Sequence, residues 1–211
     1  MNSDKRFDFD TIQDFDDHIQ KSIPNYDVLF NSIQSISEYF FVKDCKVYDL
    51  GCSTGKLLHH LKTDCEKIGY DIAKLLPKKE GFISTDLNEP FQLENACLVY
   101  SIFTMQFLNP NKRKMYLEQI YSGLNSGGAL IICEKVYQEY GKVQEIISFS
   151  HYDYKLKHFS PNDIIAKEKD LRYIMKPYSN KELTSMIESV GFNMVCDFWQ
   201  MFNFRGIIAI K

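Results

Sequence analysis

The sequence lacks any apolar run close to the ~18 residues that would indicate a membrane span. It also lacks, near its amino end, the apolar segment of a secretion signal, so we expect a cytoplasmic protein. Internal repeats and low-complexity tracts are missing too, and a length of 211 residues suits one domain. These absences predict a single globular domain, residues 1–211, that does not contact a membrane.

An excess of basic charge is also missing, because 25 Lys and Arg stand against 28 Asp and Glu and leave a net charge of −3. Without a global positive field, direct nucleic-acid binding is not favoured. The six cysteines form no C-x-x-C pair. Several lie in apolar, strand-like segments, so we predict buried, reduced thiols and no metal site.

The most informative segment is residues 47–55, where an apolar strand runs into a glycine-bracketed turn. Glycine lets backbone N–H groups approach a ligand closely. The next apolar strand ends at an acid, Asp71, and an acid there can accept hydrogen bonds from both hydroxyls of a ribose. Acids at strand ends can also be simple caps. Taken with the turn, they predict a nucleoside ligand held by Asp49, Gly51, Cys52, Ser53 and Asp71.

Strand-like and helical patterns alternate along the chain. Strands are predicted at 46–50, 68–71, 82–85, 96–103 and 129–133, with an alternating pair at 193–201 and 204–210. Helical patterns cover 25–41, 56–62 and 111–124, and 72–79 has room for at most two turns. This order predicts an α/β, doubly wound, mostly parallel seven-stranded sheet with an antiparallel edge. A helical N-terminal segment, 1–41, and a helical cap, 141–190, complete the domain.

The glycine turn and its two acids resemble the cofactor site of class I S-adenosylmethionine (SAM) methyltransferases. Further motifs, in the same order and over nearly the whole chain, resemble those of the carboxy-SAM synthases. They are K-S-I-P-N-Y at 21–26, V-Y-D-L-G-C-S at 47–53, F-T-M-Q-F-L at 103–108, E-K at 134–135, H-Y-D-Y-K at 151–155 and Q-M-F-N-F at 200–204.

This resemblance implies that SAM and prephenate react to give carboxy-SAM and phenylpyruvate, for a modification of the tRNA wobble uridine. It also implies a homodimer. The ligand contacts that it carries over are Tyr26, the turn Gly51-Cys52-Ser53, Asp71 with Ile72, and Asp86 with Leu87. The turn would pass the methionyl end, Asp71 would bind the ribose, and Asp86 would accept from the adenine amino group. The Tyr26 hydroxyl would reach the carboxylate or sulfonium end.

Three departures from the family pattern bear on the reaction. Ile102 stands where the family has asparagine, and Glu168 stands where the family has an arginine that pairs with the transferred carboxylate. Arg172, one helical turn further on, is our candidate to replace that arginine. The segment between Asp71 and Asp86 is shorter than in the family, which alters the adenine pocket.

Three hypotheses follow from these departures. The chain is a carboxy-SAM synthase with a rearranged carboxylate clamp, an ordinary SAM-dependent methyltransferase with an unidentified acceptor, or a non-catalytic SAM-binding paralogue. His151 and Asp153 are either a proton-handling pair that faces the pocket or a pair hydrogen-bonded within a helix.

Overall fold

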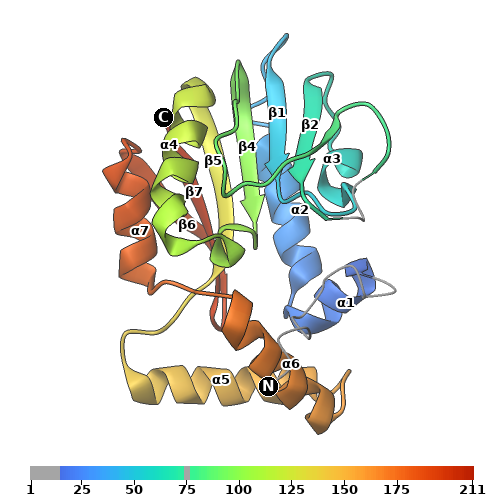
Figure 1. Ribbon diagram of the computed structural model, residues 1–211, viewed down its shortest axis with the longest axis vertical. Coiled ribbons are helices and arrows are strands. Elements are labelled where there is room, and N and C mark those ends of the chain that lie inside the picture. The colour runs from blue at the N-terminus through green and yellow to red at the C-terminus, as the bar shows by residue number, and fades with distance from the viewer. Residues whose placement is uncertain (1–14, 74–76) are drawn as a thin grey trace.

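A computed structural model describes residues 15–73 and 77–211 (Figure 1). Its strands are β1 (Lys46–Leu50), β2 (Glu66–Asp71), β3 (Phe82–Ser84), β4 (Ala96–Ile102), β5 (Leu124–Lys135), β6 (Met194–Met201) and β7 (Phe204–Ile210). Its α-helices are α1 (Phe15–Ser22), α2 (Tyr26–Ser37), α3 (Lys56–His60), α4 (Arg113–Gly123), α5 (Gly141–Lys155), α6 (Pro161–Ile174) and α7 (Asn180–Ser189).

The seven strands form one sheet in the order β3-β2-β1-β4-β5-β7-β6. The strands β1 to β5 run parallel to one another, whereas β7 runs antiparallel to both β5 and β6. The predicted α/β fold, with its mostly parallel sheet and antiparallel edge, is confirmed. Because the chain reverses its strand order between β1 and β4, a crevice opens at the carboxyl ends of these two strands.

Alternate residues of the central strands enter two cores, one on each face of the sheet. On one face, Leu130 and Ile132 of β5 pack with residues of α4 and α7. On the other face, Ile131 and Cys133 pack with residues of α2 and α3. Strands that are buried on both sides explain why β4 and β5 read as continuous apolar runs.

The helices α1, α5 and α6 lie beyond the carboxyl ends of the parallel strands, below the sheet in Figure 1. Sequence signals set the ends of these helices: Ser160 caps α6 by accepting from the Asp163 amide, and Pro161 follows at the first helical position. Residues 141–190 are mainly helical, and the helices are interrupted before Pro161, which begins α6, and around Pro177, between α6 and α7. Of the three helices there, α7 packs against the sheet instead of covering the strand ends (Figure 1).

Two boundaries differ from the predictions. Residues 125–128, which lie between the helix predicted at 111–124 and the strand predicted at 129–133, belong to β5, where Gly127 and Gly128 pair with the backbone of Lys211. Residues 1–14 and 74–76 lie outside the described part, and with them the start of the predicted N-terminal segment and the middle of the short 72–79 segment. None of the helices in the described ranges has the length and hydropathy required to cross a membrane.

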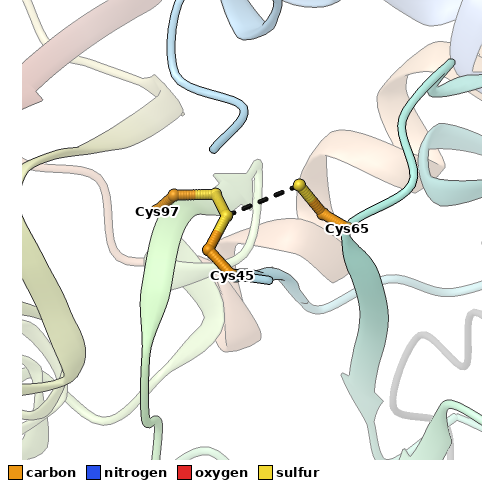
Figure 2. Close-up of side chains that lie close together, drawn as sticks. All are labelled: Cys45, Cys65 and Cys97. Atoms are coloured by element: carbon orange, nitrogen blue, oxygen red, sulfur yellow. Dashed lines mark hydrogen bonds between the residues drawn. A yellow bond between two sulfur atoms is a disulfide. The ribbon is translucent and has the colours of Figure 1, made fainter. Parts of the chain in front are cut away.

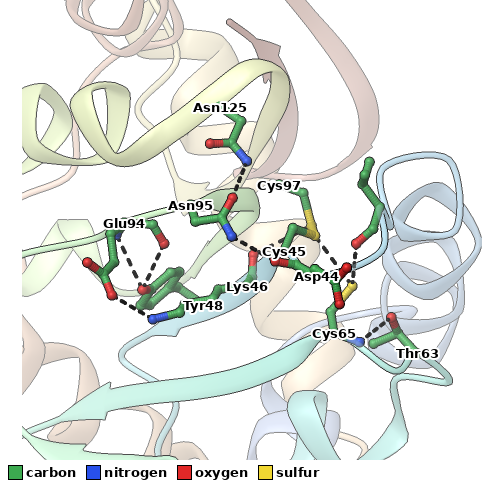
Figure 3. Close-up of a disulfide and its surroundings, with 11 residues drawn as sticks. Asp44, Cys45, Lys46, Tyr48, Thr63, Cys65, Glu94, Asn95, Cys97 and Asn125 are labelled. Atoms are coloured by element: carbon green, nitrogen blue, oxygen red, sulfur yellow. Dashed lines mark hydrogen bonds and ion pairs between the residues drawn. A yellow bond between two sulfur atoms is a disulfide. The ribbon is translucent and has the colours of Figure 1, made fainter.

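The prediction of reduced, buried thiols is wrong for three of the six cysteines. Cys45 and Cys97 form a disulfide (Figure 3), and Cys196 is exposed. Cys45 directly precedes β1, and Cys97 is the second residue of the neighbouring β4, so the pairing of the two strands brings their Cα atoms to 5.8 Å. Sequence spacing cannot show this contact, because 52 residues separate the two cysteines. The other three, Cys52, Cys65 and Cys133, are buried free thiols as predicted.

Candidate active site

A cavity of about 980 Å³ lies at the carboxyl ends of the parallel strands. It is bounded by α1 and α2, by the loops that follow β1, β2, β3 and β4, and by residues of α5 and α6. Its volume lies at the upper end of the range of about 300–1,000 Å³ for small-molecule sites. The cavity therefore has room for a nucleoside and a second small reactant.

The turn after β1 forms one wall of the cavity and is fixed by Asp71. The two carboxylate oxygens of Asp71 accept hydrogen bonds from the backbone amides of Ser53 and Ala73, each at 2.7 Å. Gly51 has φ +83°, and a Cβ there would lie 2.2 Å from Thr104 Oγ1. The turn is thus held by the carboxylate of the next strand and can follow its path only with a glycine at 51.

Asp49 lies deeper than Asp71, at the end of β1, and is almost completely buried. Burial, reinforced by the negative charge of Asp71, raises the pKa of Asp49 to about 8. At neutral pH this carboxyl group is therefore mostly protonated, and it can donate a hydrogen bond towards the cavity. Cys52 is buried under the turn, and burial raises the pKa of its thiol above the usual range, so it is not an activated nucleophile.

The predicted contacts after β2 and β3 also line the cavity: Ile72, Asp86 and Leu87. Asp86 accepts hydrogen bonds from the backbone and side-chain nitrogens of Asn88, both at 2.9 Å. Leu87 is buried, and Ile72 is 70% exposed. These residues therefore contribute one polar and two apolar side chains to the cavity lining.

Tyr26 begins α2 and lines the cavity. Burial, with the nearby charges of Asp16 and Asp49, raises the pKa of its hydroxyl. Asp16 lies on α1 and accepts a hydrogen bond from Thr54 Oγ1 at 3.4 Å, which ties α1 to the glycine turn. The Tyr26 phenol is therefore a neutral donor at neutral pH.

Beyond β4, a buried carboxyl group fixes the wall of the cavity. The two oxygens of Glu134, near the end of β5, accept from the amides of Met105 and Gln106, each at 2.9 Å. Burial, partly offset by the amide bonds and by Arg113, raises the pKa of Glu134 to about 8. Phe103, just before this turn, has φ +56°, a backbone conformation that a bulky residue rarely adopts.

Three lysines and one acid form the wall made by β5, α5 and α6. The Glu168 carboxylate forms ion pairs with Lys155 Nζ at 2.8 Å and with Lys135 Nζ at 3.7 Å. Burial opposes ionisation of Glu168, but the two ammonium groups outweigh it and lower its pKa. Lys167 contacts His18, and burial together with Lys155 lowers its pKa to about 8. This wall carries a net positive charge although an acid lies at its centre.

His151 of α5 is buried and lines the cavity, and its Nε2 lies 2.8 Å from the carbonyl oxygen of Ser22. Burial, with the charge of Lys155, lowers its pKa to about 4. The neutral ring must donate through Nε2, since a carbonyl can only accept. Asp153 is exposed and does not line the cavity, so the predicted pair of His151 and Asp153 facing the pocket is wrong.

Of the residues predicted to contact the ligands, all but Arg172 line the cavity. Arg172 is exposed, and its Nη1 donates to the Tyr137 hydroxyl at 3.2 Å. Although Arg172 is one turn from Glu168, it lines a small neighbouring pocket beside Tyr137 and not the cavity. The predicted replacement of the family's arginine by Arg172 is therefore not supported by its position.

Several cavity residues were not assigned from the sequence: Asp16, Gln106, Lys135, Lys155 and Lys167. Gln106, Lys135 and Lys155 belong to three motifs on which the family resemblance rests: F-T-M-Q-F-L, E-K and H-Y-D-Y-K. Their place in these motifs could have identified them as site residues. Asp16 is in a stretch where acids recur at short intervals, and nothing in its spacing distinguishes it from its neighbours.

Solved structures similar to this chain share its fold. They include a SAM-dependent methyltransferase from Archaeoglobus fulgidus, with a TM-score of 0.61 and 16% identity, covering 92% of this chain and 98% of that one. Human N-acetylserotonin methyltransferase in complex with SAM has a TM-score of 0.55 and 16% identity, over 87% of this chain and 55% of that one. The fold is that of the class I SAM-dependent methyltransferases.

Sequence relatives define the family within that class. No protein-family model matches the chain. A carboxy-S-adenosyl-L-methionine synthase from Staphylococcus epidermidis is 33% identical, with 95% of this chain and 94% of that protein covered. One from Shewanella halifaxensis is 32% identical, over 99% and 93%. The chain belongs to the carboxy-S-adenosyl-L-methionine synthase family, which confirms the prediction of a SAM-dependent transferase.

The close approach of the glycine turn to Thr104 gives a matched pair of substitutions. Gly51→Ala should lower the free energy of unfolding by about 2–4 kcal/mol, because it adds a steric clash to the cost of an alanine at positive φ. Gly127→Ala has a similar φ of +78° but nothing within 4 Å of its new Cβ, so it should lose only about 1 kcal/mol. Urea denaturation measures both. Equal losses would show that Thr104 does not constrain the turn.

The low pKa of His151 predicts an acid-dependent loss of stability. The unfolded state binds a proton near pH 6.5 and the folded state only near 4, so stability must fall as the pH decreases through this window. Between pH 7 and 5 this single group should cost about 2 kcal/mol.

The control for this loss is His151→Gln, because glutamine can still donate to the Ser22 carbonyl but does not titrate. Its free energy of unfolding, measured by urea denaturation at each pH, should fall by about 2 kcal/mol less than that of the wild type. Parallel pH curves for the two proteins would contradict a neutral, buried His151.

Proposed function

We propose that this enzyme is a carboxy-SAM synthase, which converts SAM and prephenate to carboxy-SAM and phenylpyruvate. The observation that carries the proposal is the division of charge in one cavity. Acids from α1, from the ends of β1 and β2 and from the loop after β3 lie on one side, with Lys56 among them: Asp16, the mostly protonated Asp49, Asp71 and Asp86. Ammonium groups from β5, α5 and α6 lie on the other: Lys135, Lys155 and Lys167.

The acidic side suits the nucleoside. We assign the ribose to Asp71, whose oxygens keep lone pairs beyond the two amide bonds, and the adenine amino group to Asp86 next to the apolar Leu87. The Gly51-Cys52-Ser53 backbone would lie along the methionyl end, and the neutral Tyr26 hydroxyl would face its carboxylate or sulfonium. A bound sulfonium supplies a methyl group whose protons are unusually acidic.

The basic side suits the second reactant. Prephenate carries two carboxylates, and buried ammonium groups bind carboxylates through charge-assisted hydrogen bonds. In this chain Lys155 and Lys135 would take the place of the family's arginine, with Glu168 orienting both of them. The acid at position 168 then repels no substrate, because the two lysines already neutralise it. Carboxy-SAM made here would serve modification of the tRNA wobble uridine.

A second function is favoured by two of the departures from the family. Glu168 uses part of the positive charge, and Ile102 presents an apolar side chain to the cavity where the family has an amide. Both changes suit a less anionic acceptor. The alternative is therefore a SAM-dependent methyltransferase whose acceptor is a small neutral molecule.

The two functions differ in their product. Purified enzyme is incubated with SAM and prephenate, denatured, and analysed by mass spectrometry. A nucleoside heavier than SAM by one carboxylate, formed together with phenylpyruvate, is expected. SAM or its demethylated product alone would favour the methyltransferase, and an enzyme that binds neither SAM nor carboxy-SAM would indicate a non-catalytic paralogue.

A substitution on the basic side tests how prephenate is held. Lys155→Gln should raise the KM for prephenate at least ~10-fold, the effect of losing one charge-assisted hydrogen bond of about 1.5–3 kcal/mol. The Kd for SAM, measured by calorimetry, should stay unchanged. The double variant Lys155→Gln/Glu168→Gln also removes the carboxylate that Lys155 pairs with. It should show the same increase in the KM for prephenate.

The matched control is Lys157→Gln, an exposed lysine just beyond the end of α5. It should leave both constants unchanged. If Lys155→Gln weakens SAM as much as prephenate, Lys155 supports the fold of the cavity and not the second substrate.

We further propose that the chain acts as a homodimer through α5. One side of α5 carries exposed apolar side chains at helical spacing, Val143, Ile146 and Phe149, and α5 lies below the sheet in Figure 1. Apolar contiguity of this kind marks interaction surfaces. The inner side of the same helix carries His151 and Lys155, so a partner there would stabilise the cavity wall.

Light scattering coupled to gel filtration tests this surface. The wild type is expected to elute as a dimer, and Phe149→Glu as a monomer, because it places a charge in the apolar contact. Glu145→Gln, a mild change at another exposed position of α5, is the control and should remain a dimer. A monomeric wild type would contradict the proposal.

A further inference from the structure

Three cysteines converge at the amino ends of three adjacent strands, the edge of the sheet opposite the cavity. Cys45 directly precedes β1, Cys65 directly precedes β2, and Cys97 is the second residue of β4 (Figure 2). All three sulfur atoms lie within 4.8 Å of one another. Cys45 and Cys97 form the disulfide, and Cys65 Sγ points at Cys45 Sγ from 3.4 Å (Figure 2).

This cluster is separate from the candidate active site. None of its three residues lines the cavity, and all are buried, with exposed fractions of 3%, 9% and 3% for Cys45, Cys65 and Cys97. The Cys65 thiol lies 3.4 Å from the carbonyl oxygen of Val42, and the Cys65 amide donates to Thr63 Oγ1 at 3.1 Å (Figure 3). Its chemistry is thus available without any change at the ligand site.

We propose that these residues form a thiol–disulfide exchange site in which Cys45 is the shared sulfur. Cys65, as its thiolate, attacks Cys45 Sγ; a new Cys45–Cys65 bond forms, the Cys45–Cys97 bond breaks, and Cys97 leaves as a thiolate. The proton that Cys65 releases passes to Cys97. No oxidant or reductant is consumed, because one disulfide and one thiol are present on each side of the reaction.

The first disulfide requires an oxidant, which we assign to the class of hydroperoxides. Two thiols and one hydroperoxide give one disulfide, water and the corresponding alcohol, or a second water when the oxidant is hydrogen peroxide. Removal of the disulfide requires a dithiol reductant. In a reducing compartment such a disulfide is formed and reduced repeatedly and is not permanent. Such reversible formation is characteristic of redox-sensing sites. Exchange keeps β1 linked to either neighbour, β4 or β2.

A metal ion is the other occupant that three thiols can take. Three thiolates with a bound Zn²⁺ would bury one net negative charge, and three thiolates with a soft monovalent ion would bury two. Lys46, which follows Cys45 in the chain, is already paired with Glu94 at 2.7 Å and Glu66 at 3.7 Å. Without a compensating cation, burial of that charge is costly, whereas a disulfide is neutral.

The test maps disulfides in the full-length protein. Reduced protein is oxidised with hydrogen peroxide, quenched in acid, alkylated, digested without reductant and analysed by mass spectrometry. In the wild type, Cys45 is expected in two disulfides, with Cys97 and with Cys65, and thiol titration after denaturation should fall from six to four.

Variants separate the two partners. Cys97→Ser should give the Cys45–Cys65 disulfide in full, Cys65→Ser only Cys45–Cys97, and Cys45→Ser should lose both of these disulfides. Cys133→Ser, a buried free thiol outside the cluster, is the control and should match the wild type. Circular dichroism confirms that each variant is folded, and the wild-type map does not depend on any substitution.

Two results would overturn the proposal. One is a wild-type protein in which Cys65 never appears in a disulfide with Cys45 and folded Cys97→Ser keeps both thiols free. The other is retention of one equivalent of Zn²⁺ by the reduced wild type after dialysis, measured by plasma mass spectrometry, which would make the cluster a metal site.

Discussion

The carboxyl group of Glu134 is the interaction on which the rest of this site depends. It binds the amides of Met105 and Gln106 and so fixes the turn after β4 to the end of β5. Arg113, buried in α4, donates to the carbonyl of Gln106 from the other side. Because a buried polar group without partners costs free energy, this network admits essentially one arrangement, and that arrangement places Thr104 against the glycine turn.

Carboxyl and ammonium groups both line the cavity at this edge of the sheet, and their protonation states differ because their environments differ. Asp49 is deep enough to hold a proton at neutral pH, while Asp71 lies at the rim and binds two backbone amides. On the facing wall, Glu168 is ionised because it lies between two lysines. A cavity with one acidic and one basic side can hold a sulfonium nucleoside and an anionic partner side by side, as the reaction that we propose requires.

Much of the acidic side of the candidate site was predictable, because it depends on local sequence. Asp49 and Asp71 each end an apolar strand, and parallel strands that end at one edge must bring such residues together. The glycines at 51 and 55 mark the turn, since both have positive φ. The lysines were harder to assign: Lys135 and Lys155 appeared only as letters in motifs, and their shared partner, Glu168, lies more than ten residues from either. Nothing in the sequence indicates which side of α6 faces the cavity.

The sequence by itself determined the succession of strands and helices along the chain, the glycine turn after β1 and the family, because these depend on periodicity, on glycine and on short motifs. Only the tertiary structure decided the order of the strands in the sheet, which cations line the cavity and which cysteines meet. Glu168 and Arg172 are one helical turn apart, yet the tilt of α6 directs one into the cavity and the other to Tyr137. Cys45 and Cys97 meet through strand pairing across 52 residues. Contacts of this kind depend on how elements pack, and packing is a property of the whole chain.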